Sequence, residues 1–272
     1  MERIGLYAAL ASLVLAIITS LIVATNRGKE SSKAGTRRGG DRIGTTLAVI
    51  GVGCITVSII SRALLTGHGP FSNMYEFAIA FSWGIVVAGL AFQWRYSTSA
   101  VKNIGIIIAI LLLLFATRLS VKYGGLVPAL QQSFLLSVHV AAAIVAYGTL
   151  TIGFAAAVLF LIQSRKSLPG LPEPKVLDNM SHAAVVIGFP FLTLTIVLGA
   201  LWADIAWGRY WGWEPKETAS LVTWLVYAAY LHARVMRHWR GTRSAVLVIL
   251  GFVAIVLTFF GNYIFSGLHS YQ

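Results

Sequence analysis

An all-α polytopic membrane protein, with about eight transmembrane helices and a tryptophan-rich loop outside the cytoplasm, is the fold class that this sequence predicts. Hydrophobic residues make up 57% of the 272 residues and charged residues only 11%, whereas soluble domains carry roughly 25% charged residues. The apolar residues form runs of about 20, and a helix of that length crosses a ~30 Å hydrocarbon core at ~1.5 Å per residue. Lys and Arg gather in alternate loops between the runs, as they do in membrane proteins of fixed orientation.

Eight apolar spans follow one another along the chain: 5–25, 43–65, 71–93, 101–118, 134–163, 182–203, 217–235 and 244–266. No linker between them is long enough to separate domains, so residues 1–272 are expected to form a single integral membrane domain. Two N-terminal spans occupy 5–65, and a core begins at about residue 67. The Pro-rich stretch 168–175 predicts a turn. The first span is expected to be a retained anchor, because no small-residue cleavage site precedes the basic loop that follows it.

The basic residues define an orientation. The first loop and every second loop after it hold most of the 21 Lys and Arg residues: Arg27, Lys29, Lys33, Arg37, Arg38 and Arg42, then Arg95 and Lys102, then Arg165, Lys166 and Lys175, then Arg234, Arg237, Arg240 and Arg243. Loops of this kind face the cytoplasm, so both termini are expected on the outer side of a plasma (bacterial inner) membrane. The net charge of +12 is therefore a topology signal, and no nucleic-acid partner is expected.

Five of the eight tryptophans gather around one short loop: Trp202, Trp207, Trp211, Trp213 and Trp224. We call residues 206–218, AWGRYWGWEPKET, the tryptophan loop, and the charge pattern places it on the outer side. An aromatic belt at the headgroup level explains one or two tryptophans per helix end. It explains poorly a run that also contains two glycines, an arginine and a Glu-Pro-Lys-Glu turn. A flat apolar platform for a porphyrin, with basic residues within reach of its propionates, is the alternative interpretation.

The end of this loop carries a helix-start signal. Glu214 places a carboxylate beside the positive end of the helix dipole. Pro215 suits the first helical turn, where its missing N–H costs nothing. The seventh span is therefore expected to begin here.

Three of the six histidines are expected near the outer side. His139 lies about one turn into the fifth span, and His269 follows the eighth span. Imidazole is a common axial ligand of haem iron, and one histidine on each face could clamp a haem. His68 lies in a short outer turn and could be a simple interfacial residue.

The other three histidines are expected nearer the cytoplasm. His182 and His238 lie at cytoplasmic ends of spans, where a solvated or headgroup role is expected. His232 lies inside the seventh span, about 21 Å beyond Thr218 along the helix axis. An ionisable residue within a span indicates function, although a hydrogen bond to a neighbouring helix also fits. We expect no second histidine of this chain at the depth of His232, so a second haem ligand there would come from a partner.

The sequence also resembles a known family. The segment WGRYWGWEPKETASLVTWLVYAAYLHAR, residues 207–234, resembles the WWD signature of haem-handling membrane proteins, and we place the WWD segment at 202–232. GHGPFSNMYEF, LLSVHVAAAIVAYGTL and the terminal GLHSY resemble further segments of one branch, the CcsA/ResC cytochrome c biogenesis proteins of system II. The resemblance extends from about residue 67 to the C-terminus. One position departs from it, since Glu214 stands where the signature has Asp.

The resemblance implies a cofactor and its ligands. His139 and His269 match the outward-facing histidines that hold haem b at the external site, and His232 matches the histidine that holds it within the membrane. A CcsB/ResB-type membrane partner is expected to supply the other intramembrane ligand. The expected haem platform comprises Trp202, Trp207, Trp211, Trp213, Glu214 and Trp224. The candidates for propionate contacts are Arg118, Lys122, Arg209 and Lys216, each of which could equally be a simple surface charge.

Together these features predict a membrane subunit of a cytochrome c synthase. It would take haem from the cytoplasmic side and present it outside for covalent attachment to the CxxCH motif of an apocytochrome c. Thiol-reducing, thioredoxin-like proteins are further expected partners. The only cysteine, Cys54, lies in an apolar run, so the reacting thiols belong to the substrate, and no catalytic residue is assigned. The alternatives are a haem exporter or chaperone without attachment activity, and a b-type dihaem membrane electron carrier.

Overall fold

The computed structural model describes residues 2–30, 41–69, 72–119 and 133–264, and these residues form helices joined by short connections. The helices in chain order are α1 (Glu2–Glu30), α2 (Arg42–Thr66), α3 (Met74–Tyr96), α4 (Ala100–Arg118), α5 (Ser133–Arg165), α6 (Pro174–Trp207), α7 (Pro215–Met236) and α8 (Thr242–Ile264). Each of the eight expected spans is confirmed as a helix. The fold is therefore an all-α polytopic membrane protein.

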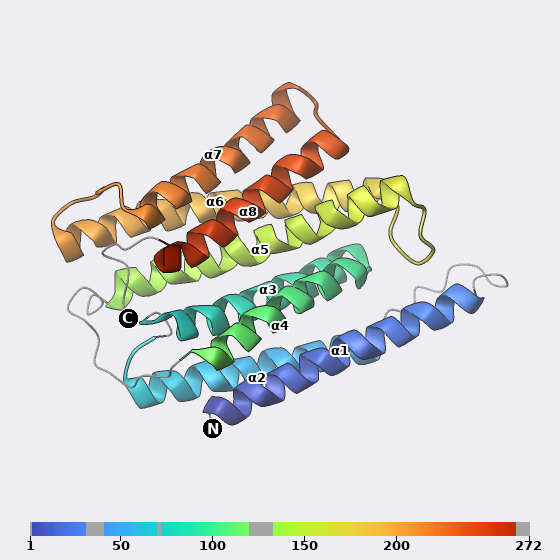
Figure 1. Ribbon diagram of the computed structural model, residues 1–272, viewed down its shortest axis with the longest axis horizontal. Coiled ribbons are helices and arrows are strands. Elements are labelled where there is room, and N and C mark those ends of the chain that lie inside the picture. The colour runs from blue at the N-terminus through green and yellow to red at the C-terminus, as the bar shows by residue number, and fades with distance from the viewer. Residues whose placement is uncertain (1, 31–40, 70–71, 120–132, 265–272) are drawn as a thin grey trace.

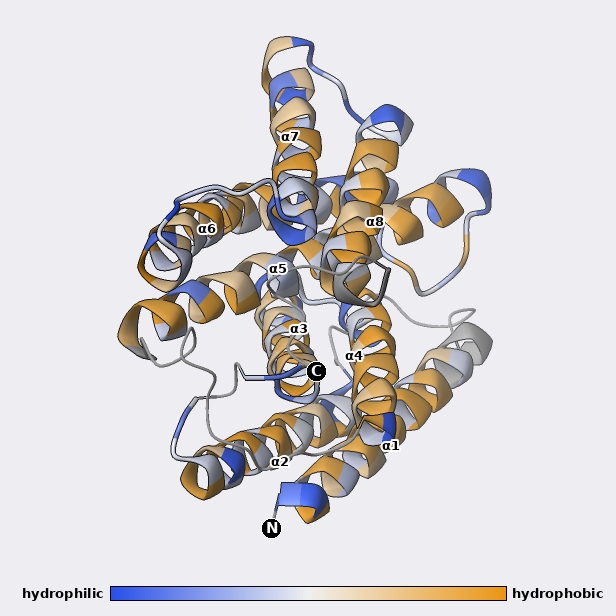
Figure 2. Cartoon of the chain, turned by 60° about the vertical axis from the view of Figure 1, so that its left-hand side comes forward, coloured by the Kyte–Doolittle hydropathy of each residue, from blue (hydrophilic) through white to orange (hydrophobic). Residues whose placement is uncertain are grey.

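The helices run alternately in opposite directions across an elongated bundle (Figure 1). We call the end that holds residues 202–216 the tryptophan end, and the opposite end the basic end. The α1–α2 pair lies along one side of the bundle, α3 and α4 lie in the middle, and α5 to α8 form the other side (Figure 1). Apolar residues cover the lengths of the helices, whereas hydrophilic residues gather at the helix ends and connections (Figure 2).

Local signals set several helix boundaries. Asp41 caps α2 and Asn73 caps α3, each by accepting a backbone N–H from inside the first turn. Helix α6 begins at Pro174, eight residues before the expected span, because a proline is compatible with a first helical turn. It ends at Trp207, and the following cap residue, Gly208, has the left-handed conformation (φ 71°) that glycine adopts without strain.

Helix α5 packs against α3, α4, α6 and α8 at the centre of the bundle. It approaches α3 closely because two glycines meet there. A Cβ on Gly148 would lie 2.7 Å from the carbonyl oxygen of Gly84, and a Cβ on Gly84 would lie 2.5 Å from a methyl group of Ile144. Small residues let helices in a membrane approach backbone to backbone, and this contact fixes α3 against the helix that carries His139.

Buried ion pairs tie the α1–α2 pair to the middle layer. At the tryptophan end, the guanidinium of Arg62 lies 2.9 Å from the carboxylate of Glu76 on α3 and 3.5 Å from that of Glu2 on α1. At the basic end, Lys102 on α4 lies 3.7 Å from Asp41 at the start of α2. Because an unpaired charge in hydrocarbon is costly, both clusters hold the pair in register.

Helix α7 differs from the other helices. The other seven are long and apolar enough to cross a membrane, and α7 is the described helix that falls short of that apolarity. Polar residues recur at helical spacing along its inward face: Ser220, Thr223, Tyr227, Tyr230 and Arg234. They make three polar contacts with α6 and α8: Thr223 with Thr258 (3.2 Å), Tyr230 with His182 (3.3 Å) and Arg234 with Asp178 (2.7 Å). The neighbouring helices therefore provide partners for Thr223, Tyr230 and Arg234 on this face, whereas the buried hydroxyl of Tyr227 makes no hydrogen bond within the described residues.

We predict that Gly148→Ala destabilises the bundle. The added methyl group meets backbone atoms of α3, which cannot turn aside as a side chain can, and overpacking of this kind costs about 1–3 kcal/mol. The measurement is the thermal unfolding midpoint of the purified protein in detergent, which should fall. Gly53→Ala is the control, because a Cβ at Gly53 has no neighbour within 4 Å among the described residues. An equal midpoint for both variants would contradict the role given to this contact.

Candidate functional site

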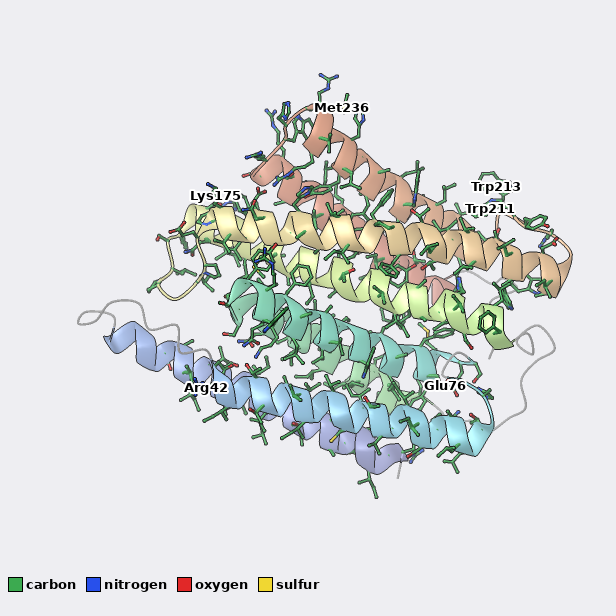
Figure 3. The ribbon with its side chains drawn as sticks, turned by 180° about the vertical axis from the view of Figure 1, so that it is seen from behind. Arg42, Glu76, Lys175, Trp211, Trp213 and Met236 are labelled. Atoms are coloured by element: carbon green, nitrogen blue, oxygen red, sulfur yellow. The ribbon has the colours of Figure 1, made fainter. Side chains whose placement is uncertain are left out.

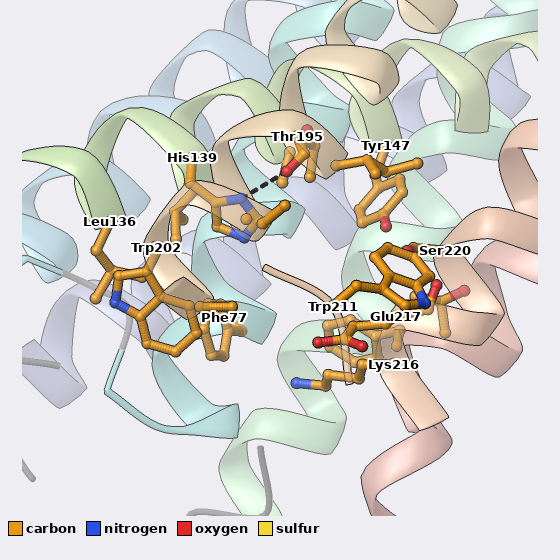
Figure 4. A pocket seen from close by; sticks show the side chains of 18 of the residues that line it. Phe77, Leu136, His139, Tyr147, Thr195, Trp202, Trp211, Lys216, Glu217 and Ser220 are labelled. Carbon is orange, nitrogen blue, oxygen red and sulfur yellow. Dashed lines mark hydrogen bonds between the residues drawn. The ribbon is translucent and has the colours of Figure 1, made fainter. Parts of the chain in front are cut away.

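A cavity opens at the tryptophan end between α3, α5, α6, α7 and α8, and Tyr210 and Trp211 of the tryptophan loop also line it. Its volume is about 160 Å³, and most of its lining is apolar. Figure 4 shows His139, Trp202, Trp211 and Lys216 arranged around the same space. The cavity therefore brings together residues that lie as far apart in the sequence as α3 and α8.

His139 points into this cavity from α5 (Figure 4). Its Nδ1 lies 2.8 Å from the backbone carbonyl oxygen of Thr195 on α6. A carbonyl can only accept, so Nδ1 carries the hydrogen and Nε2 keeps a free lone pair. Histidines that bind metals are commonly held in this way, with the second nitrogen donating to a carbonyl.

Gly199 makes room for that imidazole. A Cβ at Gly199 would lie 2.9 Å from Cε1 of His139 and 3.2 Å from its Nδ1. Gly199 is one helical turn beyond Thr195 on the same face of α6. The two residues thus provide a hydrogen-bond acceptor and a space for one ring.

Aromatic side chains form the walls of the cavity. Trp202 is only 4% exposed and packs on Leu136 and Val140 of α5. Phe77 from α3 and Tyr147 from α5 add two further rings, and Trp211 covers the side nearest α7 (Figure 4). These surfaces suit a flat apolar ligand.

Lys216 supplies the positive charge of the cavity. Its ammonium lies 5.7 Å from the centre of the Phe77 ring, a cation–π distance. It makes no ion pair with any carboxylate in the described parts of the chain. The charge is therefore available to an anionic group of a ligand.

Glu217 shapes the tryptophan loop. Its carboxylate accepts the backbone N–H of Gly212 at 2.8 Å and that of Glu214 at 3.1 Å. Glu214 and Glu217 form a reciprocal capping box at the start of α7, and Glu214 also lies 3.6 Å from the guanidinium of Arg209. The expected helix start at Glu214 and Pro215 is thus confirmed. Glu214 has a longer side chain than the Asp of the signature that the sequence resembles, and this longer side chain is compatible with the cap.

The remaining tryptophans of the expected platform lie outside the cavity lining. Trp207 packs edge-on against Trp202, with 4.8 Å between ring centres. Trp213 is 70% exposed and meets Trp211 edge-on at 5.8 Å (Figure 3). Trp224 lies deeper, where its indole N–H donates to the hydroxyl of Thr193 at 2.9 Å. Trp207 and Trp213 therefore contact tryptophans of the cavity lining, whereas Trp224 contacts α6 away from it.

The candidates for propionate contacts also differ in whether they line the cavity. Lys216 lines the cavity, Arg209 is directed to Glu214, and Arg118 is exposed at the end of α4. Lys122 and His269 lie outside the described residues. His68 is half-buried in its turn, with Nδ1 2.8 Å from the carbonyl oxygen of Gly69.

His232 is exposed on the outward face of α7, well away from the cavity. The expectation that no other histidine lies at its depth is wrong. His182 contacts Tyr230, which is two residues or about 3 Å along the helix from His232. Residues two apart point to nearly opposite sides of a helix, so His182 and His232 lie on different sides of α7 and cannot share one ligand.

Several residues of the cavity were not anticipated from the sequence. Thr195 and Gly199 matter through contacts that span more than 50 residues, and no local pattern marks them. Tyr147 is one of many aromatic residues in apolar runs. Glu217 did have a signal, because an acidic residue three positions after a helix cap indicates a capping box.

Comparison with known proteins identifies a family. Residues 71–269 match the family described as Cytochrome C assembly protein. The cytochrome c biogenesis protein CcsA of Guillardia theta is 38% identical over 249 residues, which cover 80% of this chain and 82% of that protein. CcsA of Prochlorococcus marinus (strain MIT 9312) is 37% identical over 252 residues, or 80% of each chain. CcsA of Trieres chinensis is 37% identical over 251 residues, covering 78% of this chain and 80% of that protein.

We predict that Glu217→Ala loosens the tryptophan loop. The backbone N–H groups of Gly212 and Glu214 lose their shared acceptor, and a hydrogen bond to a charged group contributes about 1.5–3 kcal/mol. Amide hydrogen exchange, read by mass spectrometry over residues 208–216, should become about tenfold faster or more. Glu173→Ala is the matched control, since Glu173 also precedes a proline at a helix start but makes no side-chain cap bond. Unchanged exchange in Glu217→Ala would show that the carboxylate does not hold the loop.

Proposed function

Given that the chain belongs to the cytochrome C assembly protein family, we propose that it is a membrane subunit of a cytochrome c synthase. In this proposal it receives haem b from the cytoplasmic side and presents it at the tryptophan end, outside the membrane. There it supports covalent attachment of the haem to the CxxCH motif of an apocytochrome c.

One observation carries the proposal, namely the setting of His139. Its Nδ1 is held by the carbonyl of Thr195, and its other nitrogen is directed into an aromatic cavity. A neutral imidazole oriented by a backbone carbonyl is the form that binds iron. His269 is proposed as the ligand on the opposite face of the haem.

The size and charge of the cavity suit a haem that is bound along one edge and remains accessible along another. At about 160 Å³, the cavity is smaller than the ~300–1,000 Å³ of pockets that bury most of a small-molecule ligand. One edge of the porphyrin would therefore enter between Trp202 and Trp211 while another edge stays accessible from outside. Lys216 lies in the lining and is suited to bind one propionate.

The attachment reaction depends more on how the protein positions the haem beside the thiols than on a nucleophile supplied by the protein. Each thioether forms when the S–H of an apocytochrome cysteine adds across a haem vinyl group, so the proton and the sulfur both come from the thiol. Holding the vinyl groups beside the two thiols makes the reaction effectively intramolecular. Thioredoxin-like proteins would keep the thiols reduced, and axial imidazoles would help to hold the iron in its reduced state.

His232 is proposed as a ligand for haem on its way across the membrane. It lies on the exposed face of α7, where a second membrane protein can reach it. His182 lies on the other side of the same helix, so the opposite ligand would come from the CcsB/ResB-type partner. A dihaem electron carrier needs two complete bis-histidine sites, and the described residues offer no second histidine facing His232.

Coexpression tests the proposal and separates it from a haem exporter. The chain, its partner and an apocytochrome c are expressed in cells that lack their own assembly system, and covalent haem is detected by staining after denaturing electrophoresis. Holocytochrome should form with the wild type. His232→Ala should lose copurifying haem at both sites, whereas Val235→Ala, a change at an exposed neighbour on α7, should retain it.

Two results would contradict the proposal. Haem bound by the wild type without any holocytochrome would leave an exporter or chaperone. Normal haem content and activity in His232→Ala would exclude the route from inside to outside.

We predict that Gly199→Ala weakens haem at the tryptophan end and leaves haem held by His232 in place. The methyl group displaces the imidazole of His139 from the carbonyl of Thr195. Loss of that orienting hydrogen bond, about 0.5–1.5 kcal/mol, corresponds to an affinity that is weaker by about twofold to tenfold. Absorbance titration with haem measures this, with Gly53→Ala as the control. Unaltered affinity would mean that the Thr195 carbonyl does not orient the ligand.

A further inference from the structure

The connection between α7 and α8, residues 237–241, is built around one partly buried ion pair. Asp178 on α6 binds Arg234 on α7 through both carboxylate oxygens, at 2.7 and 2.9 Å. The same carboxylate accepts the backbone N–H of Gly241 at 3.3 Å. Asp178 is therefore fully engaged, and it attaches the connection to the body of the bundle.

The backbone of this connection is tightly held. The N–H of Trp239 donates to the carbonyl of Ala233 at 3.1 Å, and the hydroxyl of Ser244 donates to the carbonyl of Trp239 at 3.2 Å. His238 has φ 51°, which a residue other than glycine adopts only when its surroundings enforce it. The connection is therefore a defined shape and not a loose link.

Three arginines lie here, and all are exposed: Arg237 and Arg240 in the connection and Arg243 in the first turn of α8. None of them forms an ion pair within the described parts of the chain. The guanidinium of Arg243 lies 5.7 Å from the centre of the Trp239 ring, so it already has a cation–π contact. Arg237 and Arg240 remain as two exposed cations without an ion-pair partner among the described residues.

The exposed face of α7 leads directly to these cations. His232 and Met236 are four residues apart and share that face, with the apolar residues Val222 and Leu225 nearer the tryptophan end. Met236 ends the helix at the edge of the molecule (Figure 3). Arg237 follows at once, about 7.5 Å along the axis from His232. The apolar residues, His232 and the two cations thus follow one another along the chain from the middle of α7 to the connection beyond its end.

We propose that Arg237 and Arg240 bind the two propionate carboxylates of the haem whose iron is held by His232. The inference rests on the proposed function, and it identifies the cytoplasmic loading site of that route. A haem has a flat apolar body and two anionic groups on one edge, which match the apolar residues and the two cations. Guanidinium groups suit carboxylates because they present paired N–H donors. An exposed position at the expected cytoplasmic end lets haem enter without burying unpaired charge.

The test compares haem b with its propionate dimethyl ester, which keeps the iron and the porphyrin but has no carboxylates. The chain is purified with its membrane partner in phosphatidylcholine nanodiscs, and it carries His139→Ala so that the outer site does not contribute. Affinity is measured from the haem absorbance change. The test variant is Arg237→Gln/Arg240→Gln. The control is Arg95→Gln, which removes the charge of another exposed arginine at the same end of the bundle.

The complex without arginine changes should bind haem at least about tenfold more tightly than the ester, the effect of one charge-assisted hydrogen bond. The double variant should bind haem only as well as the ester, and its ester affinity should equal that of the parent. Arg95→Gln should behave as the parent. His232→Ala should abolish binding of both compounds.

Other outcomes overturn the inference in distinguishable ways. If the double variant still prefers haem over the ester, the arginines do not bind propionates, although the His232 site stands. If its affinity changes only in nanodiscs with phosphatidylglycerol, and equally for haem and ester, the turn binds phospholipid phosphate instead. If neither compound shows His232-dependent binding in the parent, the proposed intramembrane site itself is wrong.

Discussion

The close approach of α5 to its neighbours is the contact on which the candidate site depends. Gly148 and Gly84 let α3 and α5 meet at their backbones, and Gly199 lets α6 accept a ring from α5. Helices in a bilayer gain little from hiding apolar surface from one another, so close contact between small residues replaces that driving force. The cavity exists because glycines bring three helices together below it while the rings of Trp202 and Phe77 hold its walls apart.

Charge inside the bundle follows a second rule, which is that each buried group has a partner from another helix. Arg62, Lys102 and Arg234 each face a carboxylate on a neighbouring segment. These pairs specify which helices are adjacent, because a different arrangement would leave a charge alone in hydrocarbon. Lys216 lacks a carboxylate in the described residues, and it lies where the cavity opens. The contrast supports reading the first three as structural and Lys216 as a residue that serves a ligand.

The fold was largely predictable because the bilayer imposes its own length on each apolar run, and all eight spans are helices. The start of α7 was predictable from Glu214 and Pro215, since a cap is a local feature. The surroundings of His139 were not, because the carbonyl of Thr195 lies 56 residues away and any residue carries a carbonyl. The depth of His182 was misjudged because α6 begins eight residues earlier than its hydropathy suggests. Local chemistry can be read from sequence, whereas the relative height of two helices depends on packing.

The polar residues of helix α7 face the bundle and its apolar residues face away from it. This arrangement affects how the helix enters the membrane during synthesis. The bilayer alone holds α7 less firmly than its seven neighbours. Its Thr223 hydroxyl contacts Thr258 of α8, and α8 leaves the ribosome later than α7. Until then, the Thr223 hydroxyl has only the carbonyl of Ala219 within α7, and the lipid offers no further hydrogen-bond partner. Helices α7 and α8 are therefore expected to enter the membrane together as a hairpin, against an α6 that is already in place.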